Sequence, residues 1–381
     1  AGIRPELKMA SSSAFKGVKQ GCPLSAMLYV IAISPLLNRI KHDKNIKGIR
    51  VNERLVLKLT SYADDVTVFV KNQHELNVVN QHFKMYELVS GARINLDKTE
   101  AVWLGRNDPP PLNTSIKEKI KVIGLFITKE NCPEYNWNLK EAEVKNELEQ
   151  WNISNFKSKI GVINTFVLSK LLFLATIFPP TDKWIQRINK LCVRFIWDTT
   201  REVTKRELLF KPKSLGGLGA LDVGLKLKIT FCRNIAQALD RRAVWLGDGK
   251  LWSKKKGKAR KSYDAYQLLY SDFTTKYGKL NIDWINFNSK DIYKILSEYI
   301  YGGMVQHKRL SPPESEALIQ RLHSKNISEN MRDTMWLISV GRLAVRAVVR
   351  WSCYVTTKEC PVSDHGRGSG GKSGPDYPGP E

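Results

Sequence analysis

The chain has 381 residues, 42% of them hydrophobic, so it is long enough to bury a sizeable core and to form two or three domains. Its 61 lysines and arginines outnumber its 37 aspartates and glutamates, giving a formal net charge of +24. This balance favours a polyanionic partner, with nucleic acid as the first candidate. The alternative, a basic protein that is merely soluble, is disfavoured because the excess is large and spread along the chain.

No apolar stretch is long and free enough of charge for us to expect a membrane span or a membrane partner. Residues 162–178 come closest, but Asn164 and Lys170 interrupt them, so we expect a buried helix there. Residues 1–19 carry several charges and no apolar core, which argues against a signal peptide. The cysteines form no Cys-x-x-Cys pair, which favours a reduced, intracellular setting over a disulfide framework; they are Cys22, Cys132, Cys192, Cys232, Cys353 and Cys360.

Two adjacent acids, Asp64 and Asp65, stand between two apolar, β-branched runs within residues 59–70. This pattern predicts a β-hairpin with both carboxylates at its tip. Neighbouring like charges repel each other, and a divalent cation would relieve that repulsion. Paired carboxylates that hold Mg²⁺ suit phosphoryl transfer. By itself, however, Asp-Asp more often marks an ordinary turn, because acids are common turn residues.

A second motif precedes the hairpin, at residues 16–25. Two glycines and then Pro23 lead into an apolar run that predicts a helix to about Ile40. The start of such a helix offers free N–H groups to a phosphate, and Gln20 can hydrogen-bond a base or a sugar. Standing alone, this segment would be an ordinary junction between a loop and a helix. Short strand-like runs follow at residues 48–51 and 55–57.

Together and in this order, Gly17-Val18-Lys19-Gln20-Gly21-Cys22-Pro23-Leu24-Ser25 and Tyr62-Ala63-Asp64-Asp65 resemble reverse transcriptases of LINE-type retrotransposons, which lack long terminal repeats. The resemblance implies that Asp64 and Asp65 are two of three catalytic aspartates of a palm domain and bind Mg²⁺ or Mn²⁺. It implies that Gln20, Gly21 and Tyr62 contact the nucleotide or the template. The implied partners are an RNA template, a DNA primer and deoxynucleoside triphosphates.

The family has a third aspartate, on a strand before the Gln-Gly loop, whereas Glu6 is the only acid before Gln20 here. We therefore expect the chain to correspond to the C-terminal part of such an enzyme, without the fingers, the first half of the palm or the upstream endonuclease. Two metals clamp the attacking and leaving oxygens, and losing one bridging carboxylate loosens at least one of them. We expect little or no polymerase activity from the chain alone.

Residues 73–90 predict an amphipathic helix that Gly91 ends, with His74, Glu75 and His82 on its surface. Lys98 lies in a stretch similar to the family's Leu-Asn-x-x-Lys segment. It either assists the leaving pyrophosphate or is a solvated loop lysine, and both readings stay open. We expect a strand at residues 101–104. Residues 120–127 predict a short strand pair, similar to the family's primer-grip segment or simply part of the core.

From residue 138 the pattern is helical, with a long helix expected over residues 155–178. The next helix has an apolar stripe that we expect to be core rather than a base-stacking platform: Trp184, Ile185, Ile188, Leu191, Cys192, Phe195 and Ile196. These helices resemble the family's thumb, which implies that they hold the template–primer duplex by its backbone.

Residues 210–219 predict a tight turn rather than a nucleotide-binding glycine loop, and resemble the family's Pro-Lys-x-x-Gly-Gly-Leu-Gly segment. A helix is expected over residues 225–246. A basic run then binds phosphates, directs nuclear import or is a solvated loop; it comprises Lys254, Lys255, Lys256, Lys258, Arg260 and Lys261. Of the family's zinc knuckle, Cys360 keeps one ligand and Ser363 replaces the next, so no zinc site is expected.

The predicted fold class is α+β. We expect a partial polymerase palm, an antiparallel sheet with helices, over residues 1–127, and a helical thumb over 128–205. A basic, mainly helical C-terminal region follows over 206–350, and a disordered tail with the knuckle remnant over 351–381. The predicted function is that of an RNA-directed DNA polymerase fragment acting in the nucleus. The alternative is a non-catalytic nucleic-acid-binding remnant of a retroelement; the sequence upstream of Ala1 would distinguish the two.

Overall fold

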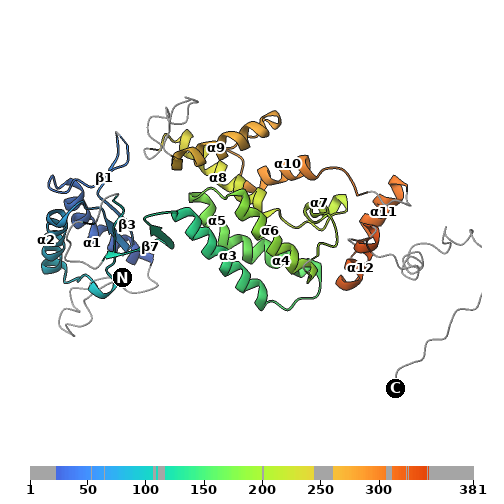
Figure 1. Cartoon of the computed structure of the whole chain (residues 1–381), viewed down its shortest axis with the longest axis horizontal. Coiled ribbons are helices and arrows are strands. Elements are labelled where there is room, and N and C mark those ends of the chain that lie inside the picture. The colour runs from blue at the N-terminus through green and yellow to red at the C-terminus, as the bar shows by residue number, and fades with distance from the viewer. Residues whose placement is uncertain are drawn as a thin grey trace, which may run out of the picture. The chain divides into compact units, whose positions relative to one another are not determined.

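The structure is a computed structural model that describes residues 23–52, 54–63, 65–105, 109, 116–199, 201–243, 261–305, 311–322, 324, 326–340 and 342. The chain divides into two compact units, whose helices and strands are labelled in Figure 1. Within the described residues, unit 1 is drawn from residues up to 151, 164–192 and 222–296. Unit 2 is drawn from residues 152–163, 193–221 and those from 297 onward.

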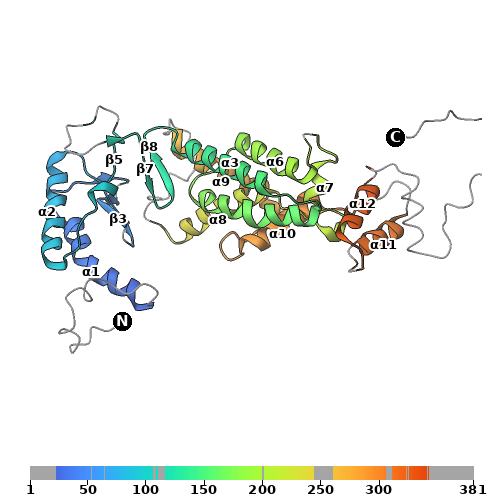
Figure 2. The same cartoon turned by 90° about the horizontal axis from the view of Figure 1, so that it is seen from below.

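Two helices and two short antiparallel hairpins open unit 1. The elements are α1 (Pro23–His42), β1 (Ile49–Arg50), β2 (Val56–Leu57), β3 (Leu59–Tyr62), β4 (Asp65–Val68) and α2 (Gln73–Ser90). β1 pairs with β2 and β3 pairs with β4, as the sequence predicts. α1 and α2 pack against each other, and α1 also contacts β3 (Figure 2). Their shared core consists of Ile33, Leu36, Ile40, Ile46 and Val79.

The helix α2 has the predicted bounds because both of its ends are capped. The side chain of Asn72 accepts a hydrogen bond from the Glu75 N–H at 3.0 Å, which satisfies a donor that the first turn leaves open. Gly91 adopts the left-handed conformation, with φ 72°, and its N–H donates to the Glu87 carbonyl. A glycine in this conformation is the common end of a helix.

The expectation that Glu75 and His82 of α2 lie on the surface is wrong, because both side chains are largely covered. Glu75 is 3% exposed, and its carboxylate accepts a hydrogen bond from the Lys71 N–H at 3.2 Å. The Nε2 of His82 lies 2.7 Å from the Asp43 carboxylate, and both side chains are 15% exposed. Each side chain is buried together with a hydrogen-bonding partner, which offsets the cost of removing it from water. His74 is exposed, as expected.

The next strands are short. β5 (Ala101–Val102) pairs in parallel with β6 (Ile116–Lys117), and β7 (Lys119–Val122) pairs antiparallel with β8 (Leu125–Thr128). A 3₁₀ turn, η2 (Leu96–Lys98), precedes β5. The strand pair predicted over 120–127 is confirmed, whereas the strand predicted over 101–104 is confined to β5.

The helical part of unit 1 contains α3 (Cys132–Gln150), α5 (Leu168–Ile177), most of α6 (Asp182–Trp197), α8 (Val223–Asp240), α9 (Lys261–Lys276) and most of α10 (Ser289–Tyr301). α5 packs on α8 and on α3. On α6, Trp184 is 1% exposed and Ile188 fully buried, so the stripe is core, as predicted. The Trp184 Nε1–H donates to the Trp137 carbonyl at 2.9 Å.

Unit 2 gathers three separate sections of the chain. It contains α4 (Phe156–Val162), the end of α6, α7 (Arg206–Phe210), the 3₁₀ turn η4 (Lys213–Leu215), α11 (Pro312–Leu322) and α12 (Glu329–Ser339). The ring of Trp336 lies within 6.3 Å of the Phe156 ring and 6.2 Å of the Trp197 ring, between ring centres. Buried Lys159 pairs with Asp198 and donates to the Ile196 carbonyl, where α6 ends.

Two helices, Pro23–His42 and Phe156–Ile177, are long and apolar enough to cross a membrane by length and composition alone. The expectation that no stretch meets this requirement is therefore wrong. The second helix runs from α4 through a π-helical turn, Ile163–Val167, into α5. Leu171 and Leu174 on it are buried, in agreement with the predicted buried helix.

The mixture of small antiparallel sheets and many helices confirms the predicted α+β fold class. The predicted domain boundaries stay a prediction. The tail over residues 351–381, including Cys360, lies outside the described residues.

Candidate active site

The hairpin of β3 and β4 carries the acidic motif at its tip. Tyr62 and Asp65 face each other as the last residue pair of the ladder, and Ala63 follows Tyr62 in the turn. Ala63 has φ 51°, in the left-handed region that two-residue hairpin loops require. Asp64 itself lies outside the described residues. The predicted hairpin is confirmed, with Asp65 at the first position of β4.

The two faces of this hairpin differ. Side chains alternate between faces along a strand, and directly paired residues share a face. Leu59 pairs with Val68, and both pack against the core formed by α1 and α2. Tyr62 and Asp65 occupy the opposite face, where both are exposed. The hairpin therefore presents a phenol and a carboxylate side by side, on the face turned away from the helices.

Asp65 suits a divalent cation by its chemistry. Hard cations such as Mg²⁺ and Mn²⁺ bind carboxylate oxygens, and they commonly use one or two carboxylates together with substrate phosphates. The Asp65 carboxylate is exposed, and among the described residues no ion pair engages it. The part of the chain that the structure describes contains no cluster of three potential metal ligands, and Asp64 falls outside that part.

The hairpin is anchored at its base to the end of α1. The Lys58 ammonium, just before β3, donates to the Asp43 carbonyl at 2.7 Å, and the Phe69 N–H donates to the Lys58 carbonyl at 2.8 Å. The Asn45 N–H and, next, His82 hydrogen-bond the Asp43 carboxylate and lower its pKa. Asp43 thus links α1, α2 and the strand that leads to the acidic tip.

The other predicted site residues are placed only in part. Lys98 ends η2 and is exposed, and its N–H donates to Asn95 at 3.2 Å. Lys261 begins α9, and its side chain is not described. The remaining predicted site residues lie outside the described residues; they are Gln20, Gly21, Lys254, Lys255, Lys256, Lys258 and Arg260. The structure therefore brings together Tyr62 and Asp65 and leaves the other predicted contacts as predictions.

Sequence reasoning missed a basic and aromatic face on the β7–β8 hairpin. The Lys119 ammonium donates to the Tyr135 hydroxyl at 2.6 Å and lies 4.8 Å from the centre of that ring. The ammonium of Lys121 lies 6.0 Å from the centre of the Phe126 ring. Both distances fall in the range of cation–π contacts. The alternation Lys119-x-Lys121 was the available signal, because a strand places both lysines on one face, whereas Lys117 belongs to β6.

The described cysteines are isolated from one another and carry no disulfide. Burial raises the pKa of the Cys192 thiol and of the Cys232 thiol to about 12. Such thiols remain protonated at neutral pH, whereas metal binding and nucleophilic attack need the thiolate. The absence of a zinc site remains an expectation.

Residues 4–127 match a family model described as reverse transcriptase (RNA-dependent DNA polymerase). This segment contains the Gln-Gly loop, the β3–β4 hairpin and the strands up to β8. Over these residues, about a third of the chain, the sequence is therefore similar to RNA-dependent DNA polymerases.

The chain is also similar to a protein of a mobile element. It is 29% identical, over 195 residues, to the transposon TX1 uncharacterized 149 kDa protein of Xenopus laevis. The similarity covers 48% of this chain and 15% of that protein, so the chain spans a small fraction of its relative's length. The two findings together support the predicted resemblance to a retrotransposon reverse transcriptase without long terminal repeats.

Proposed function

We propose that this chain is part of an RNA-directed DNA polymerase that copies the RNA of a retrotransposon lacking long terminal repeats. One observation carries the proposal: the hairpin at residues 59–68 displays Tyr62 and Asp65 on its open face, inside the segment that matches the reverse transcriptase family. The net charge of +24 supports the same reading, because template and primer are polyanions.

Asp64 and Asp65 would hold the divalent cation, Mg²⁺ or Mn²⁺. The bound cation would neutralise charge on the reacting phosphates and polarise them. Of the chain's own residues, Asp65 supplies an exposed carboxylate at a fixed position in the ladder. Tyr62 places an aromatic ring beside that carboxylate, where it can contact the sugar or base of a nucleotide.

The other site residues have proposed roles that rest on the resemblance. Gln20 and Gly21 would position the incoming nucleotide and the template. Lys98, exposed at the end of η2, would assist the leaving pyrophosphate. The basic run over residues 254–261 would bind phosphates without reading sequence, or direct import into the nucleus.

The chain alone is proposed to have little polymerase activity. Its first 20 residues contain one acid, Glu6, and the family's third aspartate has no counterpart among them. A non-catalytic, nucleic-acid-binding chain would share the basic surface but would have no need of Asp64 and Asp65. The first test therefore measures metal binding rather than turnover.

Mn²⁺ binding to the full chain would be followed by electron paramagnetic resonance. We expect the native chain to bind one Mn²⁺ or more at this site, and D64N/D65N to lose that binding. The matched control, D97N/E118Q, also removes two exposed acids from the same part of unit 1. Equal Mn²⁺ binding by the native chain and D64N/D65N would exclude the hairpin as a metal site.

A second test restores the third carboxylate. A segment that carries the third aspartate of the resembled family would be fused before Ala1. We expect this fusion to incorporate nucleotides on a primed RNA template and the chain alone to incorporate only traces. D65N in the fusion should remove that activity, whereas D97N should retain it.

A further inference from the structure

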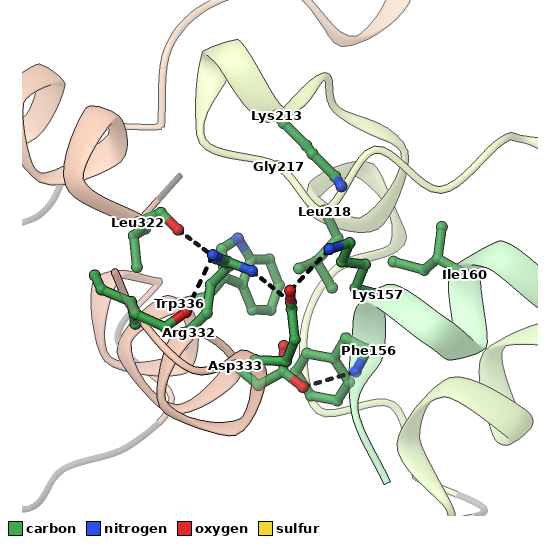
Figure 3. A pocket seen from close by; sticks show the side chains of 12 residues that line it. Phe156, Lys157, Ile160, Lys213, Gly217, Leu218, Leu322, Arg332, Asp333 and Trp336 are labelled. Carbon is green, nitrogen blue, oxygen red and sulfur yellow. Dashed lines mark hydrogen bonds and ion pairs between the residues drawn. The ribbon is translucent and has the colours of Figure 1, made fainter. Parts of the chain in front are cut away.

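Unit 2 contains a pocket of about 370 Å³ that none of the proposed polymerase roles uses (Figure 3). Its lining combines apolar side chains with charged ones of both signs: Phe156, Ile160, Leu218, Leu322, Ile327 and Trp336 are apolar, and Lys157, Lys213, Arg332, Glu329 and Asp333 are charged. Lys157 and Lys213 stand at its edge. Its volume falls in the range of small-ligand sites, for which about 300–1,000 Å³ is usual, and its apolar and charged side chains could contact different parts of one ligand.

The turn over residues 211–219 builds one wall of this pocket, and its glycines are required for steric reasons. A Cβ added to Gly217 would lie 2.0 Å from the Lys211 carbonyl oxygen. Gly216 has φ 88°, a conformation that side chains disfavour. The Trp336 Nε1–H donates to the Gly216 carbonyl at 2.9 Å, and the Val305 N–H donates to the Leu215 carbonyl at 2.8 Å. The wall is therefore held from two sides before any ligand arrives.

The same turn sets the position of Lys213. A Cβ on Gly219 would lie 3.1 Å from the Lys213 Cγ and 3.4 Å from its Cε, so the lysine stem lies along the bare glycine backbone. Figure 3 shows this stem reaching from the turn toward the pocket, with its ammonium on the same side as that of Lys157. The two ammonium groups thus come from different elements, η4 and α4, to one rim.

Lys157 retains donors for a ligand. Its ammonium donates to Glu329 at 2.8 Å, which accounts for one of the three donors that a lysine carries. Glu329 also accepts from Arg332, so two cations share its negative charge. Arg332 donates in addition to the Leu322 and Ser324 carbonyls, at 2.6 and 2.9 Å, which fixes its guanidinium within the structure.

The backbone of the turn is not a phosphate cradle. The N–H groups of Gly216, Gly217 and Gly219 donate to carbonyls within the same turn. An anion at this rim would therefore be held by lysine side chains, and recognition would be independent of sequence. If the anion is part of a nucleotide, the attached base would contact the apolar side chains of the lining, such as Phe156 and Leu218.

We propose that this pocket takes one unstacked nucleotide of a single-stranded nucleic acid, with its base against Phe156 and Leu218 and its phosphate between Lys157 and Lys213. The inference rests on the nucleic-acid role proposed above. Base contact with aromatic and apolar side chains, combined with lysine–phosphate contacts, is the usual chemistry of sequence-tolerant single-strand binding. The turn that resembles the family's Pro-Lys-x-x-Gly-Gly-Leu-Gly segment thereby gains a function besides its geometry.

The first arm of the test measures affinity. Labelled single-stranded RNA and DNA would be titrated with the full chain, with K157Q/K213Q and with the control K145Q/K279Q at several salt concentrations. Removing the two lysines that hold one phosphate should lower the affinity roughly tenfold, and should reduce the slope of log K against log salt by about 0.7. The control removes the same charge at exposed positions of unit 1. Equal slopes for the native chain and K157Q/K213Q would overturn the proposal.

The second arm locates the contact. An oligonucleotide that contains 4-thiouridine would be crosslinked to the full chain, and the modified peptides would be mapped. We expect crosslinks within residues 156–160, 211–219 or 327–336, lost in K157Q/K213Q but kept in K145Q/K279Q. Crosslinks confined to other peptides would overturn the proposal. Comparing RNA with DNA oligonucleotides identifies which strand the pocket accepts.

The two proposals can fail separately. Crosslinking at the pocket without Mn²⁺ binding at Asp64 and Asp65 would retain the pocket and remove the polymerase assignment. Metal binding and nucleotide incorporation without a pocket crosslink would do the reverse. Lys157 and Lys213 are both exposed, so K157Q/K213Q should have nearly the same unfolding midpoint temperature as the native chain. Thermal unfolding followed by circular dichroism would verify this.

Discussion

Asn136 hydrogen-bonds both backbone polar groups of Phe126. Its Oδ1 accepts the Phe126 N–H at 2.9 Å, and its Nδ2 donates to the Phe126 carbonyl at 2.7 Å. The side chain of Asn136 is buried, and its amide makes the two hydrogen bonds to β8 that the backbone of a neighbouring strand would otherwise make. This contact joins α3 to the β7–β8 hairpin and covers backbone groups that would otherwise lose hydrogen bonds on burial.

N136A should lower the free energy of unfolding by about 1–3 kcal/mol, because it leaves the Phe126 N–H without a partner and leaves the Phe126 carbonyl with only the weak Cys132 thiol donor. Urea unfolding of the full chain, followed by fluorescence, measures the change. The control N138A alters an exposed asparagine two residues further along α3, which removes one exposed hydrogen bond from Arg187 and should cost less than about 1 kcal/mol. Similar losses for the two variants would contradict the edge-covering role of Asn136.

Ala63 permits a direct test of the hairpin loop. Its φ of 51° disfavours side chains, and β-branched ones most of all. A63V should therefore lower the free energy of unfolding by roughly 1–2 kcal/mol or more, whereas A63G should change it by less than about 1 kcal/mol. Hydrogen exchange at the Thr67 and Phe69 amides, which the register directs toward β3 and its preceding residue Lys58, reports on the hairpin itself. A63V that exchanges as slowly as the native chain would contradict the loop conformation.

Two glycines in unit 2 should respond to alanine in opposite directions. G217A places a methyl group 2.0 Å from the Lys211 carbonyl oxygen, so the turn must move, at a cost of several kcal/mol. G161A lies on α4, where nothing approaches within 4 Å, and should stabilise by about 0.5–1 kcal/mol. Thermal unfolding of both variants measures the difference. A stable G217A would show that the turn adopts another conformation.

Glu329 should contribute a stability that depends on pH. Arg332 and, next, Lys157 hydrogen-bond its carboxylate and lower its pKa from 4.5 to about 2. Because the pKa is lower in the folded state, the stabilisation is fully present above pH 4.5 and is lost as the pH falls to 2. E329Q should flatten the unfolding free energy over that window, measured by urea titration at a series of pH values. E316Q removes an exposed carboxylate from α11 and should keep the native pH dependence.

The sequence predicted those elements whose signals are local. Asn72 and Gly91 fixed the bounds of α2, and the stripe through Trp184 and Ile188 fixed the buried face of α6. Local signals also misled in places. α3 begins at Cys132, with Pro133 in its first turn, rather than at residue 138. α8 ends at Asp240 rather than at residue 246, with Arg242 in a left-handed conformation just beyond it.

Only the part of the site that lies within the hairpin motif could be predicted from the sequence. Tyr62 and Asp65 follow from a hairpin with a two-residue loop, and their shared open face follows from the register. The burial of Glu75 and the pairing of His82 with Asp43 depend on how α1 and α2 pack, which no local pattern encodes. The pocket in unit 2 likewise depends on distant contacts, such as the one between Trp336 and Gly216.

That last contact closes a loop of 120 residues. A newly made chain emerges from the ribosome in order, at about 5–20 residues per second, so the glycine turn is synthesised seconds before its partner tryptophan exists. Until α12 appears, Leu218 and the rings of Phe156 and Trp197 lack the contacts that Trp336 gives them, so the half-made unit exposes apolar surface of the kind that favours aggregation. A premature stop codon ahead of Glu329 would therefore remove more than α12. The turn at Gly216 and the helix that begins at Phe156, both translated much earlier, would lose their contacts with Trp336.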